Sequence, residues 1–186
     1  LGDTIQPAEG RKKMLRMLSN QFNPTPVTAP PCLKTTADWA EQKLNFHPSP
    51  KQAEVLNTDA KYLILCCNRQ WGKTTTIAIK ALHHAVEKPD QTIVILSRTK
   101  HQAAILINRA TRFLPKLNIK LRRVLGFPFS LELPNGSNII AVAHSGDTSV
   151  GNTANVLVVD EAALVQDNVY WSVSASVART RGAIWL

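Results

Sequence analysis

Two short apolar runs separated by a helical segment constrain the fold of this chain more than any other feature of its sequence. The runs YLILCC (62–67) and TIVILS (92–97) have the length and continuous apolarity of buried strands. Between them, TTTIAIKALHHAVEK (74–88) has the length and the apolar periodicity of an α-helix. This β–α–β order implies parallel strands, so the sequence predicts an α/β fold with a mostly parallel central sheet flanked by helices.

Periodicity and turn residues assign the other elements of the globular part. The predicted elements are a helix over 36–45, an amphipathic helix over 100–117, a β-hairpin over 129–143, a strand over 156–159, a helix over 161–178 and a strand over 182–186. The apolar side of the second of these helices is expected to hold Ile105, Leu106, Ala110 and Phe113. The small polar stretch SGDTSVGNT (145–153) is expected to be a loop.

The chain has the size of one domain, preceded by a segment of different composition. Its 186 residues are 44% hydrophobic, which is enough for a sizeable core. Residues 1–35 combine a basic stretch, in which residues 8–20 form a predicted short helix, with a linker that holds four prolines within eight residues. We therefore expect a globular domain over 36–186. Because a predicted strand runs to Leu186, we expect the natural domain to continue further.

The charge and the cysteine content limit the classes of partner and compartment. The chain has 22 Lys+Arg against 13 Asp+Glu, a formal net charge of +9, which favours a polyanion such as nucleic acid over a merely solvated basic surface. Three cysteines give no disulfide framework or zinc spacing, and the adjacent His83 and His84 are expected to be packing or surface residues. No apolar run approaches the roughly 20 residues that span a bilayer, so we expect a soluble cytoplasmic protein.

The loop between the first strand and the first helix, CCNRQWGKTTT (66–76), has the features of a phosphate-binding loop. Gly72 permits close approach of the backbone, Lys73 supplies a charge for phosphate oxygens, and Thr74 supplies a hydroxyl for Mg²⁺. The loop departs from the pattern G-x-x-x-x-G-K-[ST] at Cys67, which stands in place of the first glycine. Taken alone, the loop therefore leaves a chance GKT as an alternative.

A second motif, VLVVDE (156–161), places two acidic residues after a predicted strand. Open α/β sheets bind ligands at the carboxyl ends of their strands. There Asp160 can hold Mg²⁺, and Glu161 can orient and deprotonate a water molecule that attacks a γ-phosphate. The alternative is that both acids cap the next helix, which stabilises a helix by only about 0.3–1 kcal/mol. Both motifs in this order favour a nucleotide-hydrolysing site.

Arg69, Gln52 and Phe46 are further candidates. A guanidinium at Arg69 can reach the γ-phosphate and stabilise the charge of a transition state, or it can be a surface arginine paired with a carboxylate of the protein. The Gln52 amide can pair with an adenine edge while Phe46 stacks on its ring. The alternative for this upstream stretch is an ordinary helix start with an exposed glutamine.

Together, F-x-P-x-x-x-Q (46–52), CNRQWGKTT (67–75) and NVLVVDEAA (155–163) resemble the ATPase domain of the large terminase subunit, the motor that packages double-stranded DNA into tailed bacteriophage heads. The resemblance covers residues 44–186 and implies a RecA/ASCE-like P-loop NTPase fold, with ATP as substrate and Mg²⁺ as cofactor. In that family the loop often lacks its first glycine and carries an arginine near its start. Arg69 fits this pattern, which accounts for Cys67.

The resemblance implies a role for each motif residue. Gln52 would recognise adenine, and Thr74 and Asp160 would hold Mg²⁺. Lys73 and Arg69 would act on the phosphates, while Glu161 would activate water as the catalytic base. The residues implied to bind ATP are Gln52, Cys67, Asn68, Arg69, Gln70, Trp71, Gly72, Lys73, Thr74 and Thr75.

The resemblance also implies partners and a location. These are double-stranded DNA, the portal protein, the small terminase subunit and further large subunits in a homo-oligomeric ring on the procapsid, in the cytoplasm of an infected or lysogenic bacterium. Many relatives have Arg-Gly where this chain has Val150-Gly151, and some of those arginines act in trans on a neighbouring subunit. Here Arg179 or Arg181 would take that role, or the role is dispensed with. The family's coupling motif and nuclease domain are absent from these 186 residues, so DNA cleavage is not expected of them.

A basic stretch is the candidate DNA-binding surface. The interval between Asp90 and Glu132 lacks acidic residues and holds eight basic ones: Arg98, Lys100, Arg109, Arg112, Lys116, Lys120, Arg122 and Arg123. Arg109, Arg112 and Lys116 share one side of the predicted helix over 100–117 and can track DNA phosphates. The alternative is the solvated face of that helix.

Two other functions fit the same motifs. A helicase or translocase of the DEAD/DEAH type shares the upstream glutamine, the phosphate loop and the acidic strand end. A degenerate nucleotide-binding module would keep the fold and lack turnover, and Cys67 and Val150 are the residues that favour it.

Overall fold

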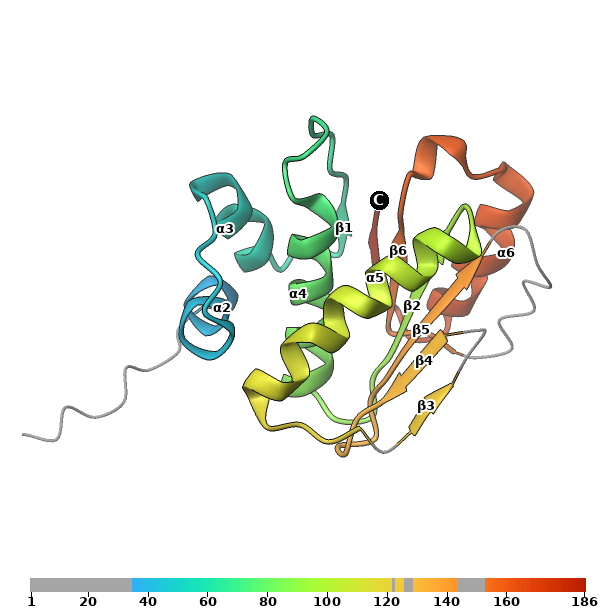
Figure 1. Cartoon of the computed structure of the whole chain (residues 1–186). Coiled ribbons are helices and arrows are strands. Elements are labelled where there is room, and N and C mark those ends of the chain that lie inside the picture. The colour runs from blue at the N-terminus through green and yellow to red at the C-terminus, as the bar shows by residue number, and fades with distance from the viewer. Residues whose placement is uncertain (1–34, 122, 126–128, 144–152) are drawn as a thin grey trace, which may run out of the picture. The chain divides into compact units, whose positions relative to one another are not determined.

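A computed structural model describes residues 35–186 except 122, 126–128 and 144–152 (Figure 1). The predicted helix over 8–20, the proline-rich linker and the position of Val150 lie outside the described residues.

A seven-stranded sheet forms the centre of the described structure, with the strands in the order β1-β7-β6-β2-β5-β4-β3 (Figure 1). Its strands are β1 (Tyr62–Leu63), β2 (Thr92–Ser97), β3 (Arg123–Leu125), β4 (Phe129–Glu132), β5 (Asn138–Ala143), β6 (Val156–Val159) and β7 (Ala183–Trp185). The pairs from β1 to β5 are parallel, whereas β5–β4 and β4–β3 are antiparallel. The predicted mostly parallel α/β sheet and the hairpin over 129–143 are confirmed.

The first strand differs from its prediction. Only two residues of the run over 62–67 form β1, which lies at the edge of the sheet and pairs with β7 rather than with β2. Tyr62 and Ile64 are 67% and 71% exposed, so the prediction of a buried strand is wrong here. The backbone nevertheless stays beside β7, because Leu65 N–H donates to the Leu186 carbonyl over 2.8 Å. An edge strand has one open side, which its local sequence does not reveal.

Seven helical segments pack around the sheet in the described part of the chain. They are α2 (Thr36–Leu44), α3 (Pro50–Asn57), α4 (Lys73–Glu87), α5 (Lys100–Phe113), α6 (Asp167–Ala178) and the 3₁₀ turns η1 (Leu114–Leu117) and η2 (Ala162–Leu164). The predicted continuous helix over 161–178 is wrong in its first residues, because Glu161 has left-handed backbone angles (φ 55°, ψ 45°) and α6 begins only at Asp167. On α5, Ile105 is 39% exposed, and Ala103 and Ile107 are buried in its place.

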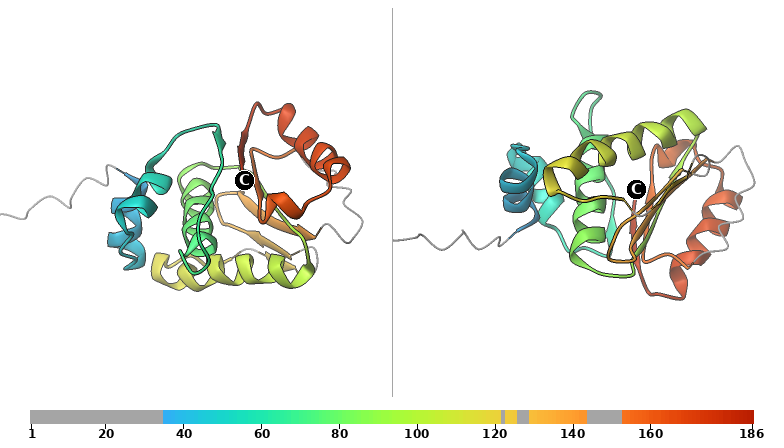
Figure 2. Two further views of the ribbon diagram at one scale, coloured as in Figure 1. Left: turned by 90° about the horizontal axis from the view of Figure 1, so that it is seen from above. Right: turned by 60° about the horizontal axis from the view of Figure 1, so that its bottom comes forward.

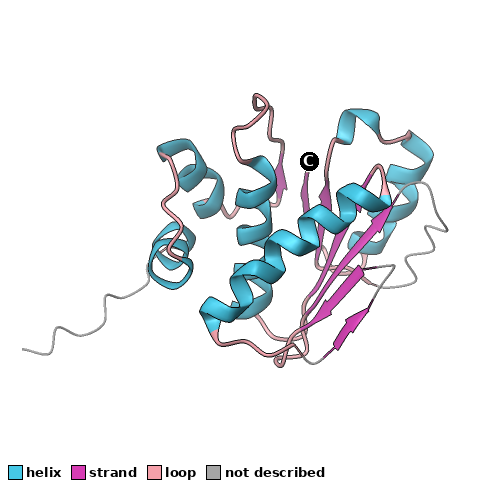
Figure 3. Ribbon diagram, in the orientation of Figure 1, coloured by secondary structure: helices cyan, strands magenta, loops and turns pink. Residues whose placement is uncertain are grey.

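The helices cover both faces of the sheet (Figures 2 and 3). Along β2, Ile93 and Ile95 face the layer of α4 and α5, which α2 and α3 extend, while Val94 and Leu96 face α6. Each such aliphatic side chain stabilises the fold by about 1.5–3 kcal/mol when fully buried. Buried side chains pack on both faces of β2 and β6. The loops that follow the carboxyl ends of these strands are therefore attached to a rigid part of the structure.

Candidate functional site

The predicted site residues follow strands whose carboxyl ends lie at the same end of the sheet. The phosphate loop follows β1 and leads into α4, and Asp160 follows β6, which runs parallel to β1 through the shared neighbour β7. The carboxyl ends of parallel strands all lie at the same end of the sheet, where α/β proteins bind ligands. The structure therefore brings the loop and the acidic motif together across the end of β7.

Gly72 shapes the end of the loop and begins α4 as its N-cap, with left-handed angles (φ 90°, ψ 18°). A Cβ atom at this position would lie 2.9 Å from Gln52 Nε2, so both the backbone and the available space require glycine. The Gly72 carbonyl accepts hydrogen bonds from the Thr76 amide and hydroxyl, at 3.0 and 3.1 Å. The first turn of α4 thus points its free N–H groups at the loop, as an anion site requires.

Cys67 occupies a part of the loop where glycine is not needed. It is exposed, and it is not among the described residues with positive φ. Gln70 is the loop residue other than glycine that takes positive φ, at 65°. The missing first glycine is therefore compatible with the backbone of this loop.

Lys73 and Asp160 form an ion pair at the start of α4. Lys73 Nζ lies 3.2 Å from Asp160 Oδ1, and the two side chains are 33% and 16% exposed. Thr74 lines the same small cavity of about 20 Å³ as Lys73 and Asp160, next to the apolar Leu186. The cavity is thus lined by an ammonium group that can bind phosphate oxygens, by a hydroxyl group and by a carboxylate.

These oxygen groups fit Mg²⁺, which prefers oxygen ligands and is usually bound by one or two carboxylates together with substrate phosphates. No group of three His, Cys, Asp or Glu side chains in the described part of the chain makes a complete metal cage. Thr74 and Asp160 are thus the residues that would hold the ion, and the nucleotide would complete its shell.

Glu161, the candidate base, contacts a residue that sequence reasoning missed. Gln102 Nε2 donates to Glu161 Oε2 over 2.7 Å. Gln102 belongs to the first turn of α5, which follows β2, the neighbour of β6. The signal that could have drawn attention to it is the pattern T-x-x-Q after a buried strand, but the pairing of β2 with β6 was not readable from the sequence.

Gln52 connects α3 to the phosphate loop. Its Nε2 donates to the Trp71 carbonyl over 2.9 Å, and its Oε1 accepts from the Ser49 amide over 2.8 Å in the capping box of α3. An amide group has two N–H donors and two acceptor lone pairs, so one donor and one acceptor remain. That remaining pair matches the donor and acceptor on the edge of adenine.

Other predicted ATP-binding residues gather beside α3. Cys67, Asn68 and Trp71 line a cavity of about 570 Å³, together with Val55 of α3 and Leu65. The next residue, Arg69, lies in the exposed stretch of the loop, and Thr75 follows in the first turn of α4. The cavity provides room for a base next to the phosphate loop.

The three predicted DNA-binding residues differ in their surroundings. Arg109 and Arg112 are exposed on α5. Lys116 Nζ donates to the Leu44 carbonyl over 2.6 Å and lies 5.9 Å from the centre of the Phe113 ring. Lys116 therefore has a structural role, because it joins η1 to the end of α2.

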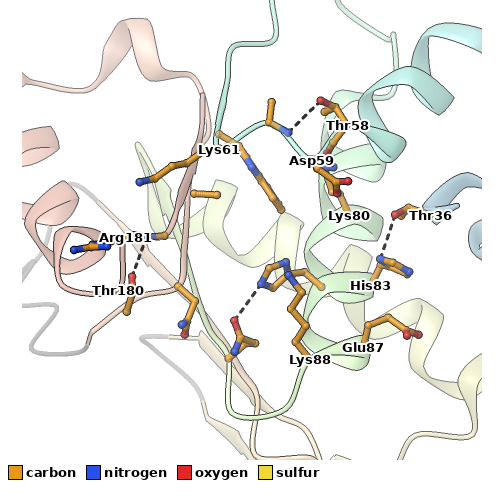
Figure 4. A pocket seen from close by; sticks show the side chains of 17 residues that line it. Thr36, Thr58, Asp59, Lys61, Lys80, His83, Glu87, Lys88, Thr180 and Arg181 are labelled. Carbon is orange, nitrogen blue, oxygen red and sulfur yellow. Dashed lines mark hydrogen bonds between the residues drawn. The ribbon is translucent and has the colours of Figure 1, made fainter.

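A larger cavity, of about 700 Å³, lies where the parallel strands begin, at the end of the sheet opposite to the phosphate loop (Figure 4). Most of its lining residues precede β1, β2, β6 and β7 or belong to the second half of α4, and they include Arg181, a candidate for a role in trans. Lys80 Nζ donates here to the Leu56 and Thr58 carbonyls at 2.9 and 2.6 Å, and burial lowers the pKa of Lys80 to about 8. Lys80 thereby ties the end of α3 to α4.

The two histidines of this cavity are packing residues, as predicted. His83 Nδ1 lies 3.3 Å from Thr36 Oγ1, and His84 Nε2 lies 3.2 Å from Gln91 Oε1. Burial is the largest cause that lowers the pKa of both imidazoles. The folded chain thus takes up protons on these side chains less readily than the unfolded chain does.

We expect an acid-induced loss of stability from His83 and His84. With folded pKa values below the usual 6.5, their contribution is complete above pH 6.5 and declines as the pH falls below that value. Urea unfolding at pH 7.5 and 5.5 checks this. The stability of the His83→Gln/His84→Gln variant should change less between the two pH values than that of the wild type, and an equal change would contradict the expectation.

Among the described residues, no helix combines the length and apolarity needed to cross a bilayer.

Comparison with solved structures supports the fold. The large terminase ATPase domain of Thermus phage P74-26 aligns with a TM-score of 0.72 and 17% identity, over 81% of this chain and 68% of that one. The large terminase of bacteriophage HK97 aligns with a TM-score of 0.68 and 22% identity, over 81% of this chain and 36% of that one. The large terminase of a thermophilic bacteriophage, in complex with ATP-gamma-S, aligns with a TM-score of 0.57 and 13% identity, over 81% of this chain and 35% of that one.

The sequence itself matches a protein family over the part that carries both motifs. Residues 65–184 match the family described as terminase large subunit, T4likevirus-type, N-terminal. The match covers more than half of the chain and includes the phosphate loop, β6 and the acidic pair that follows it. The chain therefore belongs to the family of the terminase large subunit of the T4likevirus type, in its N-terminal part.

Proposed function

We propose that residues 36–186 form an ATPase domain that hydrolyses ATP with Mg²⁺ and drives double-stranded viral DNA into a procapsid. The observation that carries this proposal is the ion pair between Lys73 and Asp160, which joins the phosphate loop to the acidic strand end at 3.2 Å. A chance GKT would not meet a carboxylate from a strand that ends 87 positions later in the chain.

The proposed roles follow from the chemistry of each group. The N–H groups in the first turn of α4 and the Lys73 ammonium bind the β- and γ-phosphates, which compete with Asp160 for the lysine. Asp160 and Thr74 would hold Mg²⁺, and the bound ion would neutralise charge on the phosphates. Glu161 orients and deprotonates the attacking water, and Arg69 stabilises charge at the γ-phosphate. Gln52 pairs with adenine through its remaining donor and acceptor.

The comparisons support a nucleotide substrate. The structurally similar large terminase of a thermophilic bacteriophage is described in complex with ATP-gamma-S, and also with ADP. Family membership supports DNA packaging as the process that the hydrolysis serves. DNA cleavage is not part of the proposed activity. The proposed partners are double-stranded DNA, the portal protein, the small terminase subunit and a ring of further large subunits, in the cytoplasm of the bacterial host.

Turnover tests the enzymatic part of the proposal. With Mg²⁺ and ATP the chain should release phosphate, and Glu161→Gln should lower the rate by about 10²-fold or more because it removes the base. Binding of an ATP analogue should stay within a few-fold, since Glu161 acts on water and not on the phosphates. Equal turnover of wild type and Glu161→Gln, with DNA present and absent, would instead favour a degenerate nucleotide-binding module.

A charge-reversal variant tests the DNA-binding surface. Arg109→Glu/Arg112→Glu should weaken binding to double-stranded DNA and make its salt dependence less steep, because fewer phosphate contacts release fewer counterions. Lys116 is left unchanged because it holds the Leu44 carbonyl. Fluorescence anisotropy at several salt concentrations gives both quantities. Unchanged affinity and an unchanged salt slope would show that the two arginines belong to a solvated face.

A further inference from the structure

Basic side chains gather in the cavity of about 700 Å³ where the parallel strands begin, away from the phosphate loop. Four of the described residues that line it are basic: Lys61, Lys80, Lys88 and Arg181. The described lining residues with carboxylates are Asp59 and Glu87. These side chains give the cavity an excess of two positive charges, which favours an anion as its ligand.

Lys80 is the buried basic residue of this cavity. It is 7% exposed, and its Nζ donates to the carbonyls of Leu56 and Thr58, so one of the three N–H donors of the ammonium group remains. Buried charges are normally paired, but no ion pair among the described residues includes Lys80. Burial lowers the pKa of Lys80 to about 8, and Asp59 offsets only part of this effect. An anion in the cavity would supply the missing counter-charge.

The other three basic side chains come from different elements around the cavity. Lys61 precedes β1, Arg181 precedes β7, and Lys88 is the C-cap of α4. In Figure 4, Lys61 and Arg181 lie on the side of the strands, whereas Lys80 and Lys88 come from the helix. All three are exposed, and within the ranges that the structure describes no ion pair includes them. Their charges are therefore available to a ligand that extends across the cavity.

The size of the cavity and the spread of its charges indicate the class of anion. Sites for small molecules typically have volumes of about 300–1,000 Å³, a range that includes this cavity. Because the basic groups stand on two sides, a ligand with two separate anionic groups can contact more of them than a single phosphate ion can. Arginine and lysine both bind phosphate oxygens through charge-assisted hydrogen bonds. These features fit an anion with two or more phosphate groups.

We propose that this cavity is a second anion site, which binds a small oligophosphate with one phosphate group at Lys80 and another at Lys61 and Arg181. The site is separate from the phosphate loop, so the inference does not depend on the proposed ATPase function. Two sources share this chemistry, a free oligophosphate and the diphosphate group of a nucleotide.

Titration calorimetry with pyrophosphate in the absence of Mg²⁺ tests the site. The full chain carries Lys73→Ala, because the phosphate loop would otherwise also attract phosphates. In this background pyrophosphate should bind, and adding Lys61→Gln/Arg181→Gln should weaken its binding by about tenfold or more, since two charged contacts are lost. Lys43→Gln, a change of an exposed lysine on α2 outside the cavity, is the matched control and should leave the affinity unchanged. Lys80 is kept because it holds two carbonyls.

ADP as a second probe distinguishes the two sources. If ADP and pyrophosphate both bind, and both lose affinity in Lys61→Gln/Arg181→Gln, the cavity accepts the diphosphate group of a nucleotide. If pyrophosphate alone does so, the ligand is a free oligophosphate. Binding of neither probe, or equal binding with and without Lys61→Gln/Arg181→Gln, would overturn the inference whether or not the chain hydrolyses ATP. Circular dichroism verifies that each variant is folded.

The imidazole signals of His84 locate the bound anion. His84 lines this cavity and not the cavity that holds Lys73 and Asp160. In ¹H–¹⁵N spectra of the Lys73→Ala chain, pyrophosphate should displace the ring signals of His84 and leave those of His101, which is exposed on α5, in place. If pyrophosphate binds while the His84 signals stay unchanged, the anion lies elsewhere and the inference is wrong.

Discussion

Replacing Lys73 by alanine is expected to abolish ATP binding, with a loss in affinity of about 10²-fold or more. The Lys73 ammonium is the cation at the start of α4, 3.2 Å from Asp160 and beside Thr74. Its loss removes the contact to the β- and γ-phosphates and leaves the Asp160 carboxylate to repel them. Titration calorimetry with an ATP analogue and Mg²⁺ measures the change.

Cys67→Gly is the matched control for Lys73→Ala, because it changes the same loop and restores the usual first glycine. Since Cys67 is exposed and has no positive φ, we expect its affinity for the analogue to stay within a few-fold of the wild type. The account of the loop would be contradicted if Lys73→Ala bound the analogue normally, or if Cys67→Gly alone abolished binding.

Replacing Gly72 by alanine is expected to damage both the stability and the nucleotide affinity of the chain. The left-handed angles at Gly72 (φ 90°) cost an alanine about 1–2 kcal/mol. The new methyl group would also lie 2.9 Å from Gln52 Nε2 and push against the hydrogen bond from Gln52 to the Trp71 carbonyl. We expect the free energy of unfolding to fall by about 1–2 kcal/mol and the affinity for an ATP analogue to fall at least tenfold.

Gln70→Gly provides a control of opposite sign for Gly72→Ala. Gln70 has φ of 65°, which glycine adopts at no steric cost, so this variant should be as stable as the wild type or more so. Urea denaturation measures both variants. If Gly72→Ala proves as stable and as tight-binding as the wild type, the conformation described for the loop is wrong.

The parts of the fold that could be predicted are those determined by local sequence. The apolar periodicity of 74–88 and the continuous apolarity of 92–97 and 156–159 correspond to α4, β2 and β6. The turn residues between 133 and 137 likewise mark the hairpin of β4 and β5. There Gly136 has φ of 84°, and a Cβ atom would overlap the Asp90 carboxylate.

The parts that could not be predicted depend on neighbours distant in the sequence. Ile64 belongs to an apolar run but is 71% exposed, because β1 is an edge strand beside β7, which lies about 120 residues further along the chain. Ile105 was expected on the buried side of α5, and the real direction of that side depends on how α5 packs on α4 and β5.

The candidate site divides in the same way. Lys73, Thr74 and Asp160 could be chosen from their motifs, because each motif places its residue at the end of a strand or the start of a helix. Gln102 could not, since its contact with Glu161 depends on the pairing of β2 with β6 and on the left-handed turn at Glu161. Similarly, the contact from Lys116 to the Leu44 carbonyl joins segments 72 positions apart.

A crystal structure of the chain with Mg²⁺ and a non-hydrolysable ATP analogue tests the central claim most directly. The β- and γ-phosphates are expected to lie against the first turn of α4 within hydrogen-bonding distance of Lys73 Nζ, with Thr74 and Asp160 as the protein ligands of Mg²⁺. An analogue bound elsewhere, for example in the cavity that includes Arg181, with Lys73 and Asp160 still paired at 3.2 Å, would contradict it.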